Sequence, residues 1–273
     1  MREISATWWR SPEGMKNLGD EITPILLRDY FNVGFFKTSV MKADLLSTGS
    51  ILSWAYSRPK WPKNRQELYV IGSGFMRPEP ISDEKHANLD FLRLISVRGH
   101  LTRHMLGKYG EGLSLGDPGL LSSLLYRKRP EKKFTAGVIP HHSNVDNPDF
   151  LDLFSEFDNY KIIDFRTDDY TSVFEEMLSC DIIISQSLHG LIISDSFGIP
   201  NAWLDNGKLH AGGEFKFHDY FSSIDRPFSK KIETNKKVKI SDVDSAIFES
   251  EQLKITSIQN DIVGAFNSFF QKV

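Results

Sequence analysis

Hydrophobic and polar positions alternate along this chain in blocks typical of strands followed by helices. Short apolar runs at residues 4–9, 134–139 and 182–185 have the length of buried strands, and polar turns follow them. Segments with helical spacing of apolar residues come after several of these turns. Because strands that alternate with helices build parallel sheets covered by helices, the pattern predicts an α/β fold.

The same pattern extends over most of the chain. Strands are predicted at residues 4–9, 44–48, 67–71, 91–97, 113–115, 134–139, 161–165, 182–185 and 201–204. Helices are predicted at residues 20–31, 148–157, 168–179 and 188–197, with two more ending at Leu106 and near Leu125. The end of the chain, residues 251–273, has an apolar stripe at helical spacing. This helix is expected to pack against a domain, and the alternative is a helix on a membrane surface.

A charged stretch at residues 126–133 divides the pattern into two similar β/α halves. We predict two Rossmann-like domains that face a cleft, at residues 1–126 and 134–235, and a helical segment at residues 236–273 that packs back on them. The basic side chains of the stretch are Arg127, Lys128, Arg129, Lys132 and Lys133. They are interpreted as a solvated linker, or as a surface that faces anionic lipid.

Composition narrows the classes of protein. The chain has 273 residues and a net charge of −3, which argues against broad nucleic-acid binding. A single cysteine excludes an internal disulfide framework and a cysteine-rich zinc site. The first ten residues lack the apolar core of a signal peptide, and no window resembles a membrane-spanning helix. We expect a cytoplasmic protein without a bound metal, with at most peripheral contact to the inner membrane face.

The most informative segment is residues 181–200, which contains a buried strand, a polar turn and a helix closed by glycine and proline. His189 stands where the strand gives way to the helix. Free N–H groups in the first turn of a helix favour phosphate or carboxylate. The helix dipole disfavours the protonated imidazole, and a bound dianion would favour it. His189 is therefore a candidate general acid, or else a side chain that caps its own turn.

Polar clusters follow several predicted strands directly, at the edge where α/β sheets bind ligands. These are Asn17-Leu18-Gly19-Asp20-Glu21, Gly72-Ser73-Gly74, Arg98-Gly99, Gly116-Asp117-Pro118, Pro140-His141-His142 and Ser185-Gln186-Ser187-Leu188-His189-Gly190. The candidate substrate-binding residues among them are Gly19, Gly72, Ser73, Gly74, His141, His142, Ser185, Ser187 and Gly190.

Three of these clusters offer charged or titratable groups. Arg98 could hold a carboxylate or phosphate through two hydrogen bonds, or could form a salt bridge to a nearby acid. Asp20 is a candidate catalytic carboxylate or an N-cap. Adjacent histidines point in different directions, so we expect one of His141 and His142 to face the cleft. The pair lacks the spacing of a zinc site.

Two glycine-containing segments give weaker signals. The run at residues 72–74 lacks the third glycine of a dinucleotide fingerprint. Residues 212–220 combine two glycines, which suggest a mobile loop, with aromatic residues, which suggest docking. Lys208 precedes this segment and is a further candidate for contact with an anion.

In order and spacing, the clusters resemble the polysaccharide pyruvyl transferase family over about residues 14–222, together with Phe197-Gly198-Ile199-Pro200. The resemblance implies a GT-B-like fold, with the acceptor on the first domain and the donor on the second. It implies phosphoenolpyruvate as the donor, a sugar of a polysaccharide or lipid-linked oligosaccharide as the acceptor, a cyclic pyruvate ketal as the product, and no cofactor.

The resemblance also implies roles for particular residues. It assigns catalysis to Arg98 and His189. Independently of the resemblance, the two sugar hydroxyls must each lose a proton, and Asp20, His141 or His142 would serve as base. Many members of the family have arginine two residues before the histidine, where this chain has Ser187. Another cation, such as Lys208, would then contact the donor. The alternatives are a GT-B glycosyltransferase that uses a nucleotide sugar and a non-catalytic, glycan-binding member.

Overall fold

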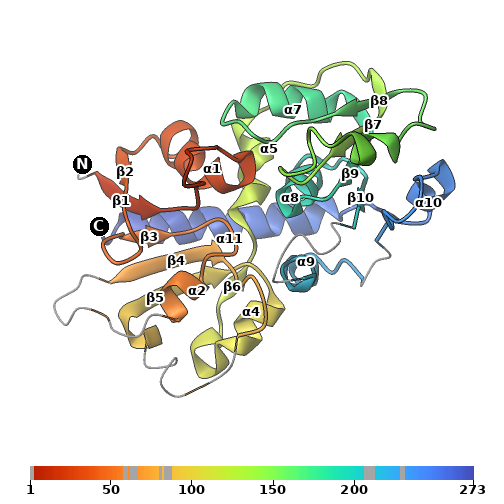
Figure 1. Cartoon of the computed structure of the whole chain (residues 1–273). Coiled ribbons are helices and arrows are strands. Elements are labelled where there is room, and N and C mark those ends of the chain that lie inside the picture. The colour runs from red at the N-terminus through yellow and green to blue at the C-terminus, as the bar shows by residue number, and fades with distance from the viewer. Residues whose placement is uncertain are drawn as a thin grey trace.

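The computed structural model describes residues 3–57, 61, 67–79, 82, 88–205, 213–227 and 231–273. Two sheets lie in separate parts of the molecule, and helices cover both (Figure 1). Of the described residues, no helix is both long enough and apolar enough to span a bilayer.

The first sheet has the strand order β2-β1-β3-β4-β5-β6 in the described part of the chain, and every pairing is parallel. Its strands are β1 (Ile4–Thr7), β2 (Phe35–Lys37), β3 (Leu45–Leu46), β4 (Leu68–Ser73), β5 (Leu92–Val97) and β6 (Ser114–Leu115). Its helices are α1 (Leu18–Ile25), α2 (Ser53–Tyr56), α4 (His100–Met105) and α5 (Ser122–Leu125). The parallel sheet predicted from the alternating pattern is confirmed.

Shorter helical segments connect these elements. They are a π-helix, η1 (Leu26–Tyr30), and three 3₁₀ segments, η2 (Asn88–Phe91), η3 (Gly107–Gly110) and η4 (Pro118–Leu121). The first predicted helix begins two residues earlier than expected, because Asn17 caps it by accepting from the Gly19 N–H. Pro24 therefore lies in the interior of α1, and the chain continues as the π-helix η1.

The second sheet has the order β11-β10-β9-β7-β8 among the described residues. Its strands are β7 (Phe134–Ile139), β8 (Tyr160–Ile162), β9 (Cys180–Ser185), β10 (Asn201–Trp203) and β11 (Ile247–Phe248). The last of these, β11, pairs antiparallel with β10. Its helices are α6 (Pro148–Asp152), α7 (Tyr170–Leu178), α8 (Leu188–Phe197), α9 (Phe215–Ser223) and α10 (Ile240–Asp244).

The last helix, α11 (Gln252–Phe270), joins the two parts of the molecule. It crosses the first sheet, where it contacts β4, β5 and β6, and it also contacts α8 beside the second sheet (Figure 1). Its predicted apolar stripe is buried, including Ile255, Ile262 and Phe266. The expectation that this stripe packs against the rest of the protein is confirmed.

One buried hydrophobic cluster runs through both parts. It contains Ile71 of the first sheet, Ile183 of the second, and Phe266 of α11. Because protein interiors are packed as densely as organic crystals, a shared cluster fixes the two sheets relative to each other. The polar segments at their carboxyl edges are therefore held in a defined arrangement.

Candidate functional site

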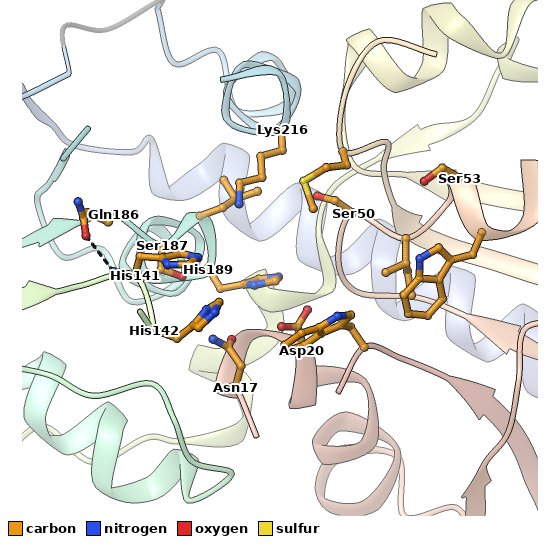
Figure 2. Close-up of a pocket in the computed structure, with 15 residues that line it drawn as sticks. Asn17, Asp20, Ser50, Ser53, His141, His142, Gln186, Ser187, His189 and Lys216 are labelled. Atoms are coloured by element: carbon orange, nitrogen blue, oxygen red, sulfur yellow. Dashed lines mark hydrogen bonds between the residues drawn. The ribbon is translucent and has the colours of Figure 1, made fainter. Parts of the chain in front are cut away.

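A cavity of about 450 Å³ lies between the carboxyl edges of the two sheets (Figure 2). Segments that follow β1, β3 and β4 line it from one part of the molecule, and segments that follow β7 and β9 line it from the other. The lining residues are Trp9, Asn17, Asp20, Ser50, Ile51, Ser53, Trp54, Met76, His141, His142, Gln186, Ser187, Leu188, His189 and Lys216. This is where open α/β sheets bind ligands.

His189 lies at the start of α8 and reaches across to the first part of the molecule. Its ring packs against Gly19 of α1, where a Cβ atom would stand only 2.1 Å from Nδ1. Only 9% of the residue is exposed. Glycine at position 19 therefore leaves the space that the imidazole occupies.

The surroundings of His189 favour its neutral form. The pKa of His189 is lowered to about 3, mainly by burial and in addition by the positive charges of Lys216 and Arg98. The direction agrees with the expectation from sequence, but the main cause is loss of hydration rather than the helix dipole. A bound anion would oppose all three effects.

Asp20 faces the same cavity from the first turn of α1 (Figure 2). The pKa of Asp20 is raised to about 7, because burial, with smaller contributions from Glu21 and Asp117, outweighs the lowering effect of the Lys216 charge. The N-cap of α1 is Asn17, so the alternative role of Asp20 as the cap is not what the structure has. A carboxyl group that titrates near neutral pH is suited to accept a proton.

Lys216 enters the cavity from α9, opposite Asn17 and Asp20 (Figure 2). The pKa of Lys216 is lowered to about 8, mainly because burial and then the charge of Arg98 outweigh the opposite effect of Asp20. Lys216 is the lysine among the described residues that line the cavity, which include no arginine, and it forms no ion pair with a described acid. An ammonium group placed in this way favours a negatively charged ligand.

His141 and His142 both line the cavity, which corrects the expectation that a single one would face it. Their rings lie against each other with centroids 3.9 Å apart, so they present adjoining edges to the same space. The Oε1 atom of Gln186 accepts the His141 N–H at 3.0 Å and thereby ties the loop after β7 to the end of β9. Burial lowers the pKa of His142, and the charge of Lys216 lowers it further.

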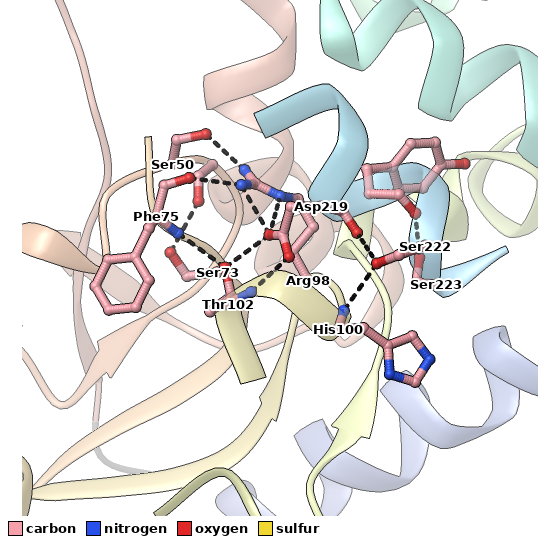
Figure 3. Close-up of polar contacts among 11 residues, drawn as sticks. Ser50, Ser73, Phe75, Arg98, His100, Thr102, Asp219, Ser222 and Ser223 are labelled. Atoms are coloured by element: carbon pink, nitrogen blue, oxygen red, sulfur yellow. Dashed lines mark hydrogen bonds and ion pairs between the residues drawn. The ribbon is translucent and has the colours of Figure 1, made fainter. Parts of the chain in front are cut away.

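Arg98 lies behind the cavity wall rather than in the lining. Its side chain is fully buried and forms an ion pair of 2.9 Å with Asp219 of α9, which is also fully buried (Figure 3). It also donates to Ser50 Oγ at 2.5 Å and to the Phe75 carbonyl at 2.6 Å. The salt bridge that the sequence left open as an alternative is therefore present.

Asp219 fastens α9 to the first part of the molecule. In addition to its ion pair with Arg98, Asp219 accepts hydrogen bonds from the Thr102 N–H and the Thr102 hydroxyl, both at 2.7 Å. Next to it, Ser222 accepts from the His100 N–H at 2.9 Å (Figure 3). The helix that carries Lys216 is thus held by the first sheet as well as by its own.

Most of the predicted glycine and serine contacts lie beneath the cavity surface. Ser73 and Ser185 are fully buried, and Ser185 Oγ accepts from the Ser187 N–H at 3.0 Å. A Cβ at Gly74 would stand 2.6 Å from the Arg98 guanidinium, and one at Gly190 would stand 2.2 Å from Ser185 Oγ. Gly72 has φ +72°. Of this set of predicted residues, Ser187 lines the cavity itself.

The remaining outcomes concern a predicted residue that the structure does not describe, lining residues that were not predicted, and metal binding. Lys208 lies outside the described residues. Lys216, Asn17 and Gln186 were not among the predicted site residues, although the last two belong to clusters that the sequence analysis singled out. No group of three or more histidine, cysteine or acidic side chains in the described part of the chain is arranged to hold a metal ion.

Comparison with known proteins identifies relatives of the chain. Residues 17–208 match the family model described as polysaccharide pyruvyl transferase. The chain is 38% identical over 175 residues to an uncharacterized protein, L143, of Acanthamoeba polyphaga mimivirus, and the aligned region covers 60% of each chain. It is 28% identical over 224 residues to the succinoglycan biosynthesis protein ExoV of Rhizobium meliloti, and the aligned region covers 80% of this chain and 64% of the relative. The chain thus spans about three fifths of the length of these curated relatives. Since the family model covers well over half of its residues, the chain belongs to the polysaccharide pyruvyl transferase family.

Proposed function

We propose that the protein transfers the pyruvyl group of phosphoenolpyruvate onto a sugar of a polysaccharide or of its lipid-linked precursor. The observation that carries the proposal is that three side chains line one cavity: the half-buried ammonium group of Lys216, the imidazole of His189 and the carboxyl group of Asp20. Family membership and the name of the Rhizobium relative, a succinoglycan biosynthesis protein, support a polysaccharide acceptor.

The donor carries a phosphate and a carboxylate, and the cavity offers groups that suit both. Lys216 supplies a positive charge, and the first turn of α8, which follows Ser187, supplies backbone N–H groups. The donor's negative charge opposes the burial and cationic effects that keep His189 neutral, and so favours its protonation. His189 is then acidic only while the donor is bound.

The proposed reaction balances without a cofactor. His189 gives a proton to the methylene carbon, which becomes the methyl group and leaves the adjacent carbon electrophilic. Two sugar hydroxyls form C–O bonds to that carbon, and the bond from carbon to the phosphate oxygen breaks. Of the two hydroxyl protons, Asp20 accepts one and returns it to His189, and the other leaves on phosphate. His141 and His142 adjoin the same space and are the alternative bases.

The sugar would occupy the end of the cavity that Trp9 and Trp54 line, because indole rings offer an apolar face beside polar groups.

The two sheets, together with α11, which contacts both parts of the molecule, would then correspond to the GT-B arrangement, with the acceptor on the first sheet. A lipid-linked acceptor would be met at the inner face of the membrane, so the proposal includes a cytoplasmic protein in peripheral contact with it.

The test is a phosphate-release assay on the purified protein with phosphoenolpyruvate and candidate acceptor glycans. We expect phosphate release that depends on the acceptor, with a new methyl signal of the ketal in the proton NMR spectrum. His189→Ala should abolish both, whereas His104→Ala, a change of an exposed histidine on α4, should leave both unchanged. Glycosyl transfer from a nucleotide sugar, with no phosphate released from phosphoenolpyruvate, would refute the proposal.

A further inference from the structure

Asp117, outside the cavity lining, lies beside the imidazole of His189. It belongs to the Gly116-Asp117-Pro118 cluster and stands at the N-cap of η4. Its Oδ1 atom is 3.9 Å from His189 Nε2, and the carboxyl group is fully buried. The opposite ring nitrogen, Nδ1, is the one that approaches Gly19 on α1.

Both groups have an unused hydrogen-bonding atom. Oδ1 of Asp117 accepts from the Gly119 N–H at 2.9 Å. In contrast, Oδ2 of Asp117 and Nε2 of His189 are buried, and neither has a hydrogen-bond partner among the described residues. Buried polar atoms are nearly always paired, and these two atoms on neighbouring side chains are available to pair with each other.

We propose that Asp117 is the positioning residue of His189, whose carboxylate accepts a hydrogen bond from Nε2 and stabilises the imidazolium once the donor is bound. This inference rests on the proposed role of His189 as the acid. Hydrogen bonds of catalytic groups are often long in an empty site and shorten in the complex. The proposal requires Nε2 and the carboxyl group, now 3.9 Å apart, to approach to about 3 Å in the complex.

The charges around the pair are consistent with this role. Lys216 and Arg98 face His189 from α9 and from the end of β5, and both disfavour its protonation. Asp117 is the acidic side chain within ion-pair distance of His189 among the described residues. The pKa of Asp117 is raised to about 6, because burial, with a contribution from Asp219, outweighs the lowering effects of the Gly119 N–H and Arg98. The carboxyl group is thus mainly ionised above neutral pH.

The test uses the role of Asp117 as the N-cap of η4. Asn is as good an N-cap as Asp, so Asp117→Asn keeps the bond to Gly119 while it removes the charge. We expect the thermal unfolding temperature and the KM for phosphoenolpyruvate to change little. We expect kcat to fall about tenfold for each unit by which the pKa of His189 drops. The matched control is Asp169→Asn, at the N-cap of α7 and outside the cavity lining, which should leave kcat unchanged.

A second readout needs no turnover. In protein with ¹⁵N-labelled histidine, the His189 ring is titrated in the presence of phospholactate, an unreactive molecule with the same two acidic groups. Loss of a carboxylate at this distance should lower the pKa of His189 in that complex by about one unit or more in Asp117→Asn. An unchanged pKa, or an unchanged kcat while His189→Ala is inactive, would overturn the role of Asp117.

The two proposals fail in different ways. Activity in His189→Ala would contradict the proposed mechanism itself, whereas inactivity of that variant together with a fully active Asp117→Asn would contradict this inference alone. If Asp117→Asn does not fold, Asp117→Ser keeps a capping oxygen without the charge. If neither folds, the ¹³C carboxyl signal of Asp117 in the native protein must shift as the His189 ring titrates, and independent midpoints would contradict the coupling.

Discussion

At the scale of single residues, the site depends on a close contact between two helices from different parts of the chain. Gly19 at the start of α1 leaves room for the His189 ring at the start of α8. We predict that Gly19→Ala displaces the ring, lowers kcat, and costs about 1–3 kcal/mol of unfolding free energy through overpacking. Gly264→Ala on α11, where a Cβ would have no neighbour within 4 Å, is the control and should leave kcat unchanged.

Lys216 provides a second prediction at this scale. If its ammonium group holds the donor, Lys216→Met removes a charged hydrogen bond and should raise the KM for phosphoenolpyruvate about 10- to 100-fold. The KM for the sugar acceptor should change much less. Steady-state kinetics measure both, with the exposed Lys108→Met as control. A KM for phosphoenolpyruvate that stays at the wild-type value would remove Lys216 from the donor site.

The coupling between Asp20 and Lys216 gives a prediction about pH. In the empty protein the Asp20 carboxyl should titrate with a pKa of about 7, and the positive charge of Lys216 contributes by lowering that pKa. Removal of the cation by Lys216→Met should therefore move the midpoint upward, so that less Asp20 is ionised at neutral pH. ¹³C NMR of the labelled carboxyl measures the midpoint, and a shift to lower pH would contradict this account of the charges.

At the scale of elements, the sequence predicted the longest and most regular segments best. The strand β7 and the helix α8 have the expected bounds, and Gly198 ends α8 in the left-handed conformation, with φ +68°. Short elements were missed, among them β2 and β11, because two or three apolar residues carry no period. The helix α6 ends five residues before its predicted limit, at Asp152.

The candidate site could be predicted only where its residues lie in a polar cluster after a strand or at the start of the following helix. Asp20, His189 and the histidine pair stand in such clusters and do line the cavity. Lys216 lies on α9, which reaches the cavity only through packing against both parts of the molecule. The burial of Arg98 depends on Asp219, a partner 121 residues away, which no local pattern reveals.

The attachment of α9 gives a prediction at the scale of elements. Arg98→Met leaves Asp219 buried without its ion-pair partner, which typically costs about 3–5 kcal/mol of unfolding free energy. Since Asp219 holds α9 three residues after Lys216, the KM for phosphoenolpyruvate should rise as well. Denaturant unfolding and steady-state kinetics measure the two effects. Lys161→Met, which breaks a more exposed pair with Glu176, should change little. Equal effects of the two variants would show that the buried pair does not anchor α9.

At the scale of the whole molecule, the cavity walls belong to two sheets that share one hydrophobic cluster. Lys216 and His189 come from elements beside the second sheet, and Asp20 comes from a helix beside the first. A small, doubly acidic donor between the sheets would contact both parts at once, so the arrangement of the parts and the chemistry depend on each other.

The most direct measurement is a crystal structure of the protein with bound phospholactate. The account predicts the ligand in the cavity between the sheets, with an acidic group about 3 Å from Lys216 Nζ and the imidazole of His189 beside the carbon that would receive the proton. A ligand bound elsewhere, or one that reaches only one of these two side chains, would contradict the central claim.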